Sequence, residues 1–262
     1  MNIDLSGKRA IVCGASKGIG RAAAQELASL GASVTLVARN EDALKKALAT
    51  LPAARGQQHD YVVADFIDTE DVEAKLKKYL AENGPVHILV NNGGGPPPGP
   101  ALSASVHDFA AIFTQHVLIG QIFVQAVVPG MKDAGYGRII NVLSTSVKAP
   151  IKGLGVSNTI RGAVAQWSKT LAGELGPFGI TVNNVLPGAT DTDRMKEIID
   201  GKVKKTGKSA ADVKADEVAL IPAGRFATPE ELGAAIAFLA SPAAAYINGI
   251  NLPVDGGRTP GL

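Results

Sequence analysis

The sequence predicts an α/β fold, a single Rossmann-type domain over residues 1–262 with a doubly wound sheet of about seven parallel strands. Short apolar runs alternate with segments of helical periodicity along the whole chain, which is typical of a parallel sheet with helices on both faces. A glycine-rich turn separates the first apolar run from the first helical segment. A chain of 262 residues can bury the core that such a domain needs.

Short apolar runs, several of them rich in β-branched residues, predict the strands. In chain order they are Ala10–Cys13, Val34–Val37, Gln58–Ala64, Ile88–Asn91, Arg138–Leu143, Thr181–Leu186 and Ile250–Pro253. Helical spacing of apolar residues predicts helices over Arg21–Leu30 and Phe109–Val128, and Gly31 provides a stop for the first of them. Because ligands bind at the carboxyl ends of the strands in such a sheet, the segments that follow the strands are the candidate binding segments.

Charge and composition exclude several classes of protein. Lys and Arg number 26 against 24 Asp and Glu, a net charge of +2 without a long block of one sign, so neither nucleic acid nor an anionic membrane is expected as the main partner. The single cysteine excludes an internal disulfide, and no metal site is predicted. No apolar run is expected to span a bilayer and no segment resembles a secretion signal. A soluble cytoplasmic protein is therefore expected.

The glycine turn after the first strand has the properties of a phosphate-binding turn. Gly14, Gly18 and Gly20 let the backbone bend sharply and approach a ligand, and the helix that follows presents free N–H groups and a positive dipole end. Their spacing is G-x-x-x-G-x-G, which differs from the commoner dinucleotide fingerprint G-x-G-x-x-G. Taken alone, the cluster is also compatible with a tight turn in another α/β protein.

Two cations indicate which nicotinamide cofactor such a turn would accept. A site for NAD would place an acid after the second strand to accept a hydrogen bond from the ribose 2′-hydroxyl, whereas this chain has Arg39. An arginine pairs bidentately with a 2′-phosphate, and Lys17 in the glycine turn would add a second positive charge. The two residues favour NADP(H), although both are also compatible with solvated surface cations.

Four separated motifs carry a resemblance to a known family. The turn CGASKGIG has the form TGxxxGIG with Cys13 in place of Thr, and Asn91-Asn92-Gly93 has the form NNAG with Gly93 in place of Ala. The proline-rich loop after the second motif is also compatible with a plain loop. Pro187 to Thr192 has the form PGxxxT, and Tyr246 to Gly257 resembles the C-terminal segment of the same family. In this order the motifs resemble the short-chain dehydrogenase/reductase family, and within it the 3-oxoacyl-carrier-protein reductases.

The resemblance implies an NADP(H) cofactor at the carboxyl ends of the strands. In the family, an Asp at the position of Asp65 contacts the adenine, and a Thr at the position of Thr192 meets the nicotinamide amide or the phosphates. The residues that the resemblance implies as cofactor ligands are Gly14, Ser16, Lys17, Gly18, Ile19, Gly20, Arg39, Asp65, Phe66, Asn91, Gly93, Arg161, Pro187, Gly188, Thr190 and Thr192.

The catalytic positions are where this sequence departs from the family. Family members reduce a carbonyl or oxidise an alcohol with an Asn-Ser-Tyr-Lys set: Ser holds the substrate oxygen, Tyr exchanges the proton, Lys assists the Tyr, and Asn supports a water relay. Matching Asn141–Ser144 to the family's N-I-S-S makes Ser144 the substrate-orienting serine. The helix Trp167–Leu175 matches the family without a gap, which places Ser157 at the Tyr position and Arg161 at the Lys position. His116 falls at the Asn position.

These substitutions change the expected acid–base chemistry. The Ser157 hydroxyl is a far weaker acid than a tyrosine, whose pKa is about 10. Arg161 stays protonated, so it can neutralise charge and bind ribose or phosphate but relays no proton. His116, with an ordinary pKa of about 6.5, is a candidate proton donor, directly or through Ser157 and a water, and is equally compatible with a polar residue on a helix. Tyr136 and Tyr246 precede the fifth and seventh strands, so both are expected to lie far from the nicotinamide.

Residues 192–222 form the segment where the family places its substrate lid. The segment is rich in Lys, Asp and Ala, and both a mobile cover and a solvated helical pair are compatible with it. The prediction is an NADP(H)-dependent oxidoreductase that reduces a carbonyl, 3-oxoacyl-like or another ketone, to an alcohol through an atypical site of Ser144, Ser157, Arg161 and His116. The alternative is a nucleotide-binding scaffold or regulatory protein that has lost catalysis. A homotetramer is expected, as in many relatives.

Overall fold

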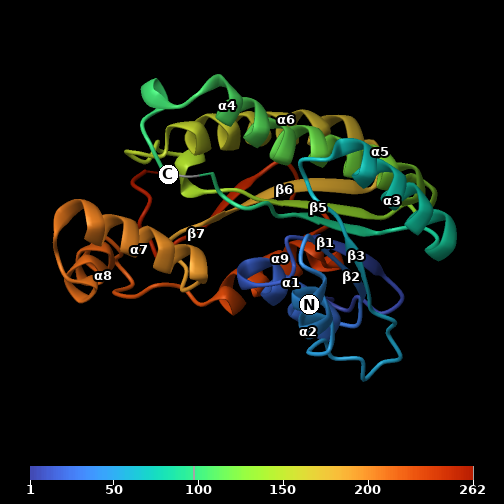
Figure 1. Cartoon of the computed structure of the whole chain (residues 1–262). Helices are drawn as coiled ribbons and strands as arrows, with labels where there is room; N and C mark the ends of the chain where they lie inside the picture. The colour runs from blue at the N-terminus through green and yellow to red at the C-terminus, as the bar shows by residue number, and fades with distance from the viewer. Residues whose placement is uncertain (97, 262) are drawn as a thin grey trace.

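The structure, a computed structural model, describes residues 1–96 and 98–261, so Pro97 of the proline-rich loop and Leu262 lie outside the described residues. Its centre is a sheet with the strand order β3-β2-β1-β4-β5-β6-β7 (Figure 1). All neighbouring strands run parallel. The strands are β1 (Arg9–Cys13), β2 (Ser33–Ala38), β3 (Asp60–Val63), β4 (Ile88–Asn91), β5 (Gly137–Val142), β6 (Ile180–Pro187) and β7 (Asn251–Val254).

The predicted doubly wound sheet is confirmed, and each predicted strand overlaps an observed one. From β1 the chain builds the sheet outward through β2 and β3, then returns to add β4 on the other side of β1. This reversal between β1 and β4 creates the crevice in which such folds bind ligands. The apolar runs identified the strands because a parallel strand is buried on both faces, and β5 is buried along its whole length.

Helices cover both faces of the sheet (Figure 1). One layer contains α1 (Gly18–Ser29), α2 (Glu41–Leu48) and α9 (Pro229–Ala240). The other contains α3 (Thr69–Asn83), α4 (Val106–Phe113), α5 (Ile119–Asp133) and α6 (Gly155–Leu175). Each layer buries its own apolar cluster against the sheet. Short 3₁₀ turns occur at Ala101–Ser103, Thr145–Val147, Gly176–Phe178 and Pro242–Ala244.

One helix is longer than the sequence predicts. The helix predicted over Phe109–Val128 is part of a continuous helix, Val106–Asp133, in which η2 (Thr114–Leu118) is a π-helical turn between α4 and α5. By length and composition this helix could cross a membrane: an 18-residue stretch of it has a mean hydropathy of 1.6, and 28% of that stretch is buried. Ile119 and Phe123 on one side of it pack in the core, while Val106 is 86% exposed.

The segment predicted as a lid contains two helices, α7 (Asp193–Thr206) and α8 (Ala210–Ala219), which extend to one side of the sheet (Figure 1). They share a small apolar cluster that includes Ile199 and Val213. Glu217 on α8 pairs with Lys202 on α7 and, through Oε2 at 3.1 Å, with Nη2 of Arg258 near the C-terminus. The two helices are therefore a packed unit tied to the C-terminal segment, and the sequence indicated only their helicity.

Candidate functional site

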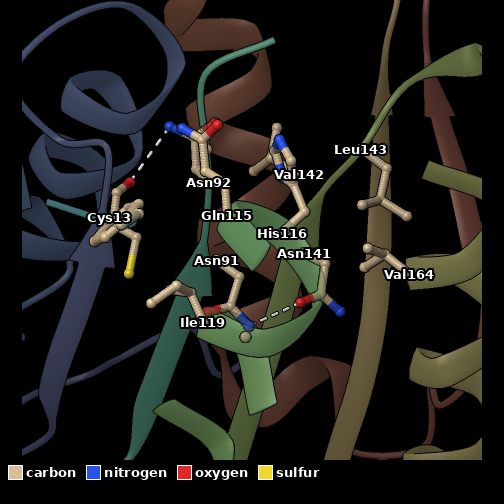
Figure 2. Close-up of a pocket in the computed structure, with 13 residues that line it drawn as sticks. Cys13, Asn91, Asn92, Gln115, His116, Ile119, Asn141, Val142, Leu143 and Val164 are labelled. Carbon is tan, nitrogen blue, oxygen red and sulfur yellow. Dashed lines mark hydrogen bonds between the residues drawn. The ribbon is translucent and has the colours of Figure 1, made fainter. Parts of the chain in front are cut away.

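The glycine turn after β1 is built for close approach. Gly14 and Gly18 have φ of 60° and 56°, the left-handed region that favours glycine. A Cβ on Gly20 would stand 2.7 Å from Nδ2 of Asn92. The same Nδ2 donates to the carbonyl oxygens of Cys13 and Gly14, each at 3.3 Å (Figure 2). The turn after β1 and the loop after β4 are thereby held together.

The N-terminus of α1 can accept an anion. Its N-cap residue is Lys17, which makes no side-chain capping bond, and the first turn of the helix carries no acidic residue. The first N–H groups of α1 are therefore free for a phosphate, and the helix dipole favours negative charge there. A Cβ on Gly18 would lie 3.5 Å from Cγ2 of Thr192, so the turn also faces the start of α7. Ser16 lies in this turn, and Ile19 lies in the first turn of α1.

The residues predicted for the adenosine half lie at the ends of β2 and β3. Arg39 is exposed, and among the described residues no carboxylate pairs with it. Lys17 instead pairs with Asp193 of α7 at 3.3 Å. Asp65 is exposed and accepts from the Ile67 N–H at 3.3 Å. Phe66 differs from these, because it is buried and packs edge-on against Phe123 with ring centroids 6.1 Å apart.

A recess lies beneath the ends of β1, β4 and β5, facing η2 (Figure 2). Its lining includes four predicted residues, Phe66, Asn91, Gly93 and His116. It also contains residues that were not predicted for the site, namely Cys13, Asn92, Gln115, Ile119, Gly120, Asn141, Val142, Leu143 and Val164. Burial raises the pKa of the Cys13 thiol, which makes it an inert, protonated wall of the recess.

A ladder of asparagines fixes the floor of this recess. Asn91 on β4 donates from Nδ2 to Oδ1 of Asn141 on β5 at 2.9 Å (Figure 2). Asn141 donates in turn to Oδ1 of Asn184 on β6 at 3.0 Å and to Oγ of Ser168 on α6 at 2.7 Å. Asn184 donates to Oδ1 of Asn251 on β7 at 2.8 Å. Four adjacent strands are thus cross-linked by paired amides, of which Asn141 and Asn184 are buried, and pairing is what buried polar groups require.

His116 is held in one tautomer at the mouth of the recess. Its Nε2 lies 2.9 Å from the carbonyl oxygen of Gly94, and because a carbonyl accepts, Nε2 carries the proton and Nδ1 keeps a lone pair. Burial and the positive charge of Arg161 lower the pKa of His116 to about 3, although the bond to Gly94 opposes the shift. At neutral pH the ring is therefore uncharged, and its one N–H is already donated.

Arg161 is the most buried charge near the recess. It lies on α6, is 7% exposed, and donates from Nη1 to the carbonyl oxygen of Val142 at 2.6 Å. Burial and the charge of Arg194 lower its pKa to about 10, so it stays positively charged at neutral pH. Ser157 lies one helical turn before it on α6 and is half-buried, so the two share a face. Ser144 follows β5, and its Oγ accepts from the Ser146 N–H at 3.1 Å.

Arg194 is a functional candidate that the sequence analysis missed. It lies in the first turn of α7, and its Nη2 donates to the carbonyl oxygen of Pro96 at 2.6 Å. A Cβ on Gly95 would stand 3.5 Å from its guanidinium. The glycine run after β4 therefore provides the room that Arg194 occupies. A sequence pattern gives no signal for this contact, since residues 96 and 194 come together only through the fold.

The segment after β6 leads into α7. Pro187 ends β6, and the Gly188 N–H donates to the carbonyl oxygen of Val254 at 3.0 Å. Thr190 is buried, and Thr192 is the N-cap of α7, where its Oγ1 accepts from the Met195 N–H at 3.4 Å. The predicted residues of this motif are thus brought beside the glycine turn at the root of α7.

Tyr136 and Tyr246 lie away from the recess. Tyr136 donates from its hydroxyl to the carbonyl oxygen of Ala240 at 2.6 Å, and Tyr246 is fully exposed. Neither lines the recess. Within residues 1–96 and 98–261, no group of three His, Cys, Asp or Glu side chains is placed to hold a metal ion.

The sheet order, the glycine turn and the loops at the strand ends define a nicotinamide-dinucleotide-type Rossmann protein. Residues 14–259 match the family described as enoyl-(acyl carrier protein) reductase. The chain belongs to the short-chain dehydrogenase/reductase family.

Several known proteins are similar along their whole length. The chain is 35% identical over 257 residues to 3-oxoacyl-(acyl-carrier-protein) reductase FabG of Vibrio harveyi, covering 97% of this chain and 98% of that protein. It is 34% identical over 264 residues to gluconate 5-dehydrogenase of Gluconobacter oxydans, covering 98% and 97%. The L-sorbose reductase of Gluconobacter frateurii, solved with NADPH and L-sorbose, superposes with a TM-score of 0.93 at 32% identity over 100% of both chains.

Proposed function

We propose that this protein is an NADP(H)-dependent oxidoreductase that reduces a ketone to an alcohol through an atypical active site. The observation that carries the proposal is the glycine turn, whose α1 N-terminus has no side-chain cap and no acid, beside the exposed Arg39, which pairs with no carboxylate in the described part of the chain. An uncapped helix end accommodates a diphosphate, and an arginine after β2 accommodates a 2′-phosphate. The names of the relatives, which include reductases and a structure solved with NADPH, support the same cofactor.

The residues that would hold the cofactor follow from this arrangement. Gly14, Gly18 and Gly20 leave room for the diphosphate, and Arg39 with Lys17 would neutralise the 2′-phosphate. Lys17 is available for this role because its ion pair with Asp193 is exposed, with side-chain exposures of 66% and 58%, and exposed pairs are weak. When bound, NADPH would supply the hydride. The recess at Asn91 and Gly93 lies at the adjoining strand ends.

The chain's own residues would then position the carbonyl and handle the proton. We place the Ser144 hydroxyl as the donor to the carbonyl oxygen and Ser157, one turn before Arg161 on α6, as its neighbour. Arg161 would stabilise negative charge that develops on the substrate oxygen. His116 would act as a hydrogen-bond acceptor at Nδ1 at neutral pH, because its pKa of about 3 leaves it uncharged. The direct donor role predicted for His116 is therefore disfavoured.

The alternative function is an NADP(H)-binding scaffold that has lost turnover. The protonation states favour it, since Arg161 has a pKa of about 10 and His116 of about 3, and neither is near the operating pH as a general acid should be. Loss of general acid–base help typically costs about 10²–10⁴-fold in rate. Such a loss would leave slow hydride transfer in a site that still orients its ligands.

Turnover separates the two functions. NADPH consumption is followed over a panel of ketones, 3-oxoacyl thioesters and quinones with the natural protein and with a Ser157→Tyr/Arg161→Lys double variant. Turnover by the natural protein supports the reductase. Turnover by the double variant alone supports the scaffold, because it means that the pocket and cofactor site are intact while the proton path is missing. Absence of NADPH binding to either protein contradicts both functions.

We further propose a cytoplasmic homotetramer whose lid, α7 and α8, closes over the substrate. The apolar helix Val106–Asp133 supports self-association rather than a membrane span, because Ile119, Phe123 and Val127 are anchored in the core and Leu118 is 43% exposed. Exposed apolar surface of this kind is typical of protein interfaces. Light scattering at several protein concentrations tests the assembly, and a monomer throughout would contradict it.

A further inference from the structure

An exposed ion pair joins the glycine turn to the first turn of α7. Nζ of Lys17 lies 3.3 Å from Oδ2 of Asp193, although 176 residues of chain separate the two. The two segments also meet at Gly18, where a Cβ would lie 3.5 Å from Cγ2 of Thr192. The start of α7 is therefore packed beside the turn that the cofactor diphosphate would occupy.

Lys17 pairs with one carboxylate in the part of the chain that the structure describes, and that carboxylate is Asp193. The Lys17 side chain makes no capping bond to α1 and is 66% exposed, so it can turn to another anion without disturbing the core. Arg39, the other cation proposed for the 2′-phosphate, is exposed and follows β2. A 2′-phosphate that binds Lys17 as well as Arg39 must therefore displace Asp193.

Asp193 can leave Lys17 at little cost. Its Oδ1 lies 4.0 Å from Nζ of Lys196, three residues further along α7, so a second cation remains beside it. Asp193 also lies in the first turn of α7, where the helix dipole stabilises a carboxylate. A phosphate monoester carries about 1.5 to 2 negative charges at neutral pH, against one on Asp193. The phosphate is therefore the stronger ligand for Lys17.

We propose that Asp193 competes with the 2′-phosphate of NADP(H) for Lys17, and so sets how strongly the protein prefers NADPH over NADH. NADPH takes Lys17 from Asp193 and thereby removes one tether between α7 and the glycine turn. NADH carries a 2′-hydroxyl and leaves the ion pair in place. The identity of the cofactor is thus transmitted to the helix that covers the substrate in the proposed function. The inference rests on that proposal for the role of Lys17, and it can be tested without turnover.

The first test is fluorescence titration of NADPH and NADH with the natural protein, Asp193→Asn, Lys17→Ala and the double variant. Asp193→Asn should bind NADPH about two- to fivefold more tightly, the range that an exposed ion pair supports, and should bind NADH as the natural protein does. In the Lys17→Ala background the same change should have little effect, because its target is gone. Asp200→Asn is the matched control, since Asp200 is an exposed carboxylate of the same helix.

The second test is amide hydrogen exchange over residues 193–199 with saturating NADPH or saturating NADH. In the natural protein we expect this segment to exchange faster with NADPH than with NADH, because only NADPH displaces Asp193 from Lys17. Asp193→Asn should remove the difference between the cofactors, since the ion pair is already lost. Loss of a carboxylate from the first turn of α7 raises exchange with both cofactors alike, so the comparison of the two isolates the competition.

Unchanged NADPH affinity in Asp193→Asn, or equal exchange with the two cofactors in the natural protein, would overturn the inference. An equal gain of NADPH affinity in Asp193→Asn and Asp200→Asn would also overturn it, because net charge alone would then explain the gain. The role of Lys17 is tested separately. If Lys17→Ala leaves NADPH affinity unchanged, Lys17 is not a phosphate ligand and both proposals fail. If Lys17→Ala weakens NADPH binding while Asp193→Asn changes nothing, the cofactor assignment stands and the competition is refuted.

Discussion

The imidazole of His116 occupies the space that a side chain on residue 93 would need. A Cβ built on Gly93 would stand 2.7 Å from Cε1 and 3.0 Å from Nδ1 of that ring. Both residues differ from those expected in the short-chain dehydrogenase/reductase family, because Gly93 stands in place of Ala and His116 in place of Asn. The two departures are therefore one structural change, in which loss of a methyl group makes room for a ring.

Gly93→Ala should destabilise the protein by about 1–3 kcal/mol, because an added methyl in a packed site forces a buried ring to move. Gly93→Ala/His116→Asn should recover most of the loss, since the smaller side chain leaves room for the methyl. Urea unfolding of the four proteins in a double-mutant cycle measures the coupling. Gly94→Ala is the control, because a Cβ there meets Nε2 of Gln115 at an ordinary 3.8 Å. Additive effects of the two changes would contradict this relationship.

The stability of the protein should depend on pH through His116. Its pKa is about 6.5 when unfolded and about 3 when folded, so between these values the unfolded chain binds the proton and the folded protein does not. Stability therefore falls as pH is lowered from about 6.5 towards 3, by up to about 1.4 kcal/mol per pH unit. In His116→Asn this contribution should vanish. The difference in unfolding free energy between the two proteins, measured against pH, isolates the effect, and a flat difference would refute it.

Arg39→Ala should lower the affinity for NADPH about tenfold to a hundredfold and leave that for NADH unchanged, because a charge-assisted bond to phosphate is worth about 1.5–3 kcal/mol. Fluorescence titration of both cofactors measures the ratio. Arg55→Ala is a suitable control, since Arg55 is a half-exposed cation paired with Asp4 at 2.9 Å. A preference for NADPH that persists in Arg39→Ala would rule out this residue as the 2′-phosphate ligand.

Glu217→Gln should loosen the packing of α7 against α8. Burial would raise the pKa of Glu217, but its bonds to Lys202 and Arg258 outweigh burial and lower it. The ion pairs therefore stabilise the α7–α8 pair above the ordinary glutamate pKa of about 4.3 and weaken as pH falls below it. The substitution should cost about 1–2 kcal/mol locally, because both cations are partly exposed. Faster amide exchange in α7 and α8 is the expected readout.

The control for this variant is Asp216→Asn on the same helix. Asp216 pairs with Lys208 in full contact with solvent, with side-chain exposures of 59% and 53%, so its loss should leave amide exchange nearly unchanged. Equal protection of α7 and α8 in the natural protein and in Glu217→Gln would mean that the apolar cluster around Ile199 alone holds the two helices together.

The fold followed from the sequence because its signals are local. The buried strands read as apolar runs, and the predicted Ile88–Asn91 coincides with β4. The glycine turn was also predictable, since Gly14 and Gly18 need left-handed φ. The contacts between residues on opposite sides of the site could not be predicted from the sequence. Arg194 meets Pro96 across 98 residues of chain, and periodicity carries no information about such pairs.

The chemistry of His116 was likewise beyond a local pattern. Its ordinary pKa suggested a proton donor, whereas burial and the charge of Arg161 make it a neutral acceptor. The sequence also gave no indication of an apolar helix as long as Val106–Asp133. Polar residues such as Gln115 interrupt this helix, so its sequence shows only short apolar runs.

The π-turn Thr114–Leu118 also bears on how the recess arose. A π-turn holds one residue more than the α-helical path between the same two ends. A single-residue insertion can therefore produce such a turn during evolution. The wider turn holds the extra residue, so the helix on either side keeps the same face against the core. Removing it would restore an ordinary helix without disturbing α4 or α5, and would cost only the outward bulge that carries Gln115 and His116 to the recess. The bulge is thus an addition to the scaffold that evolution can reverse.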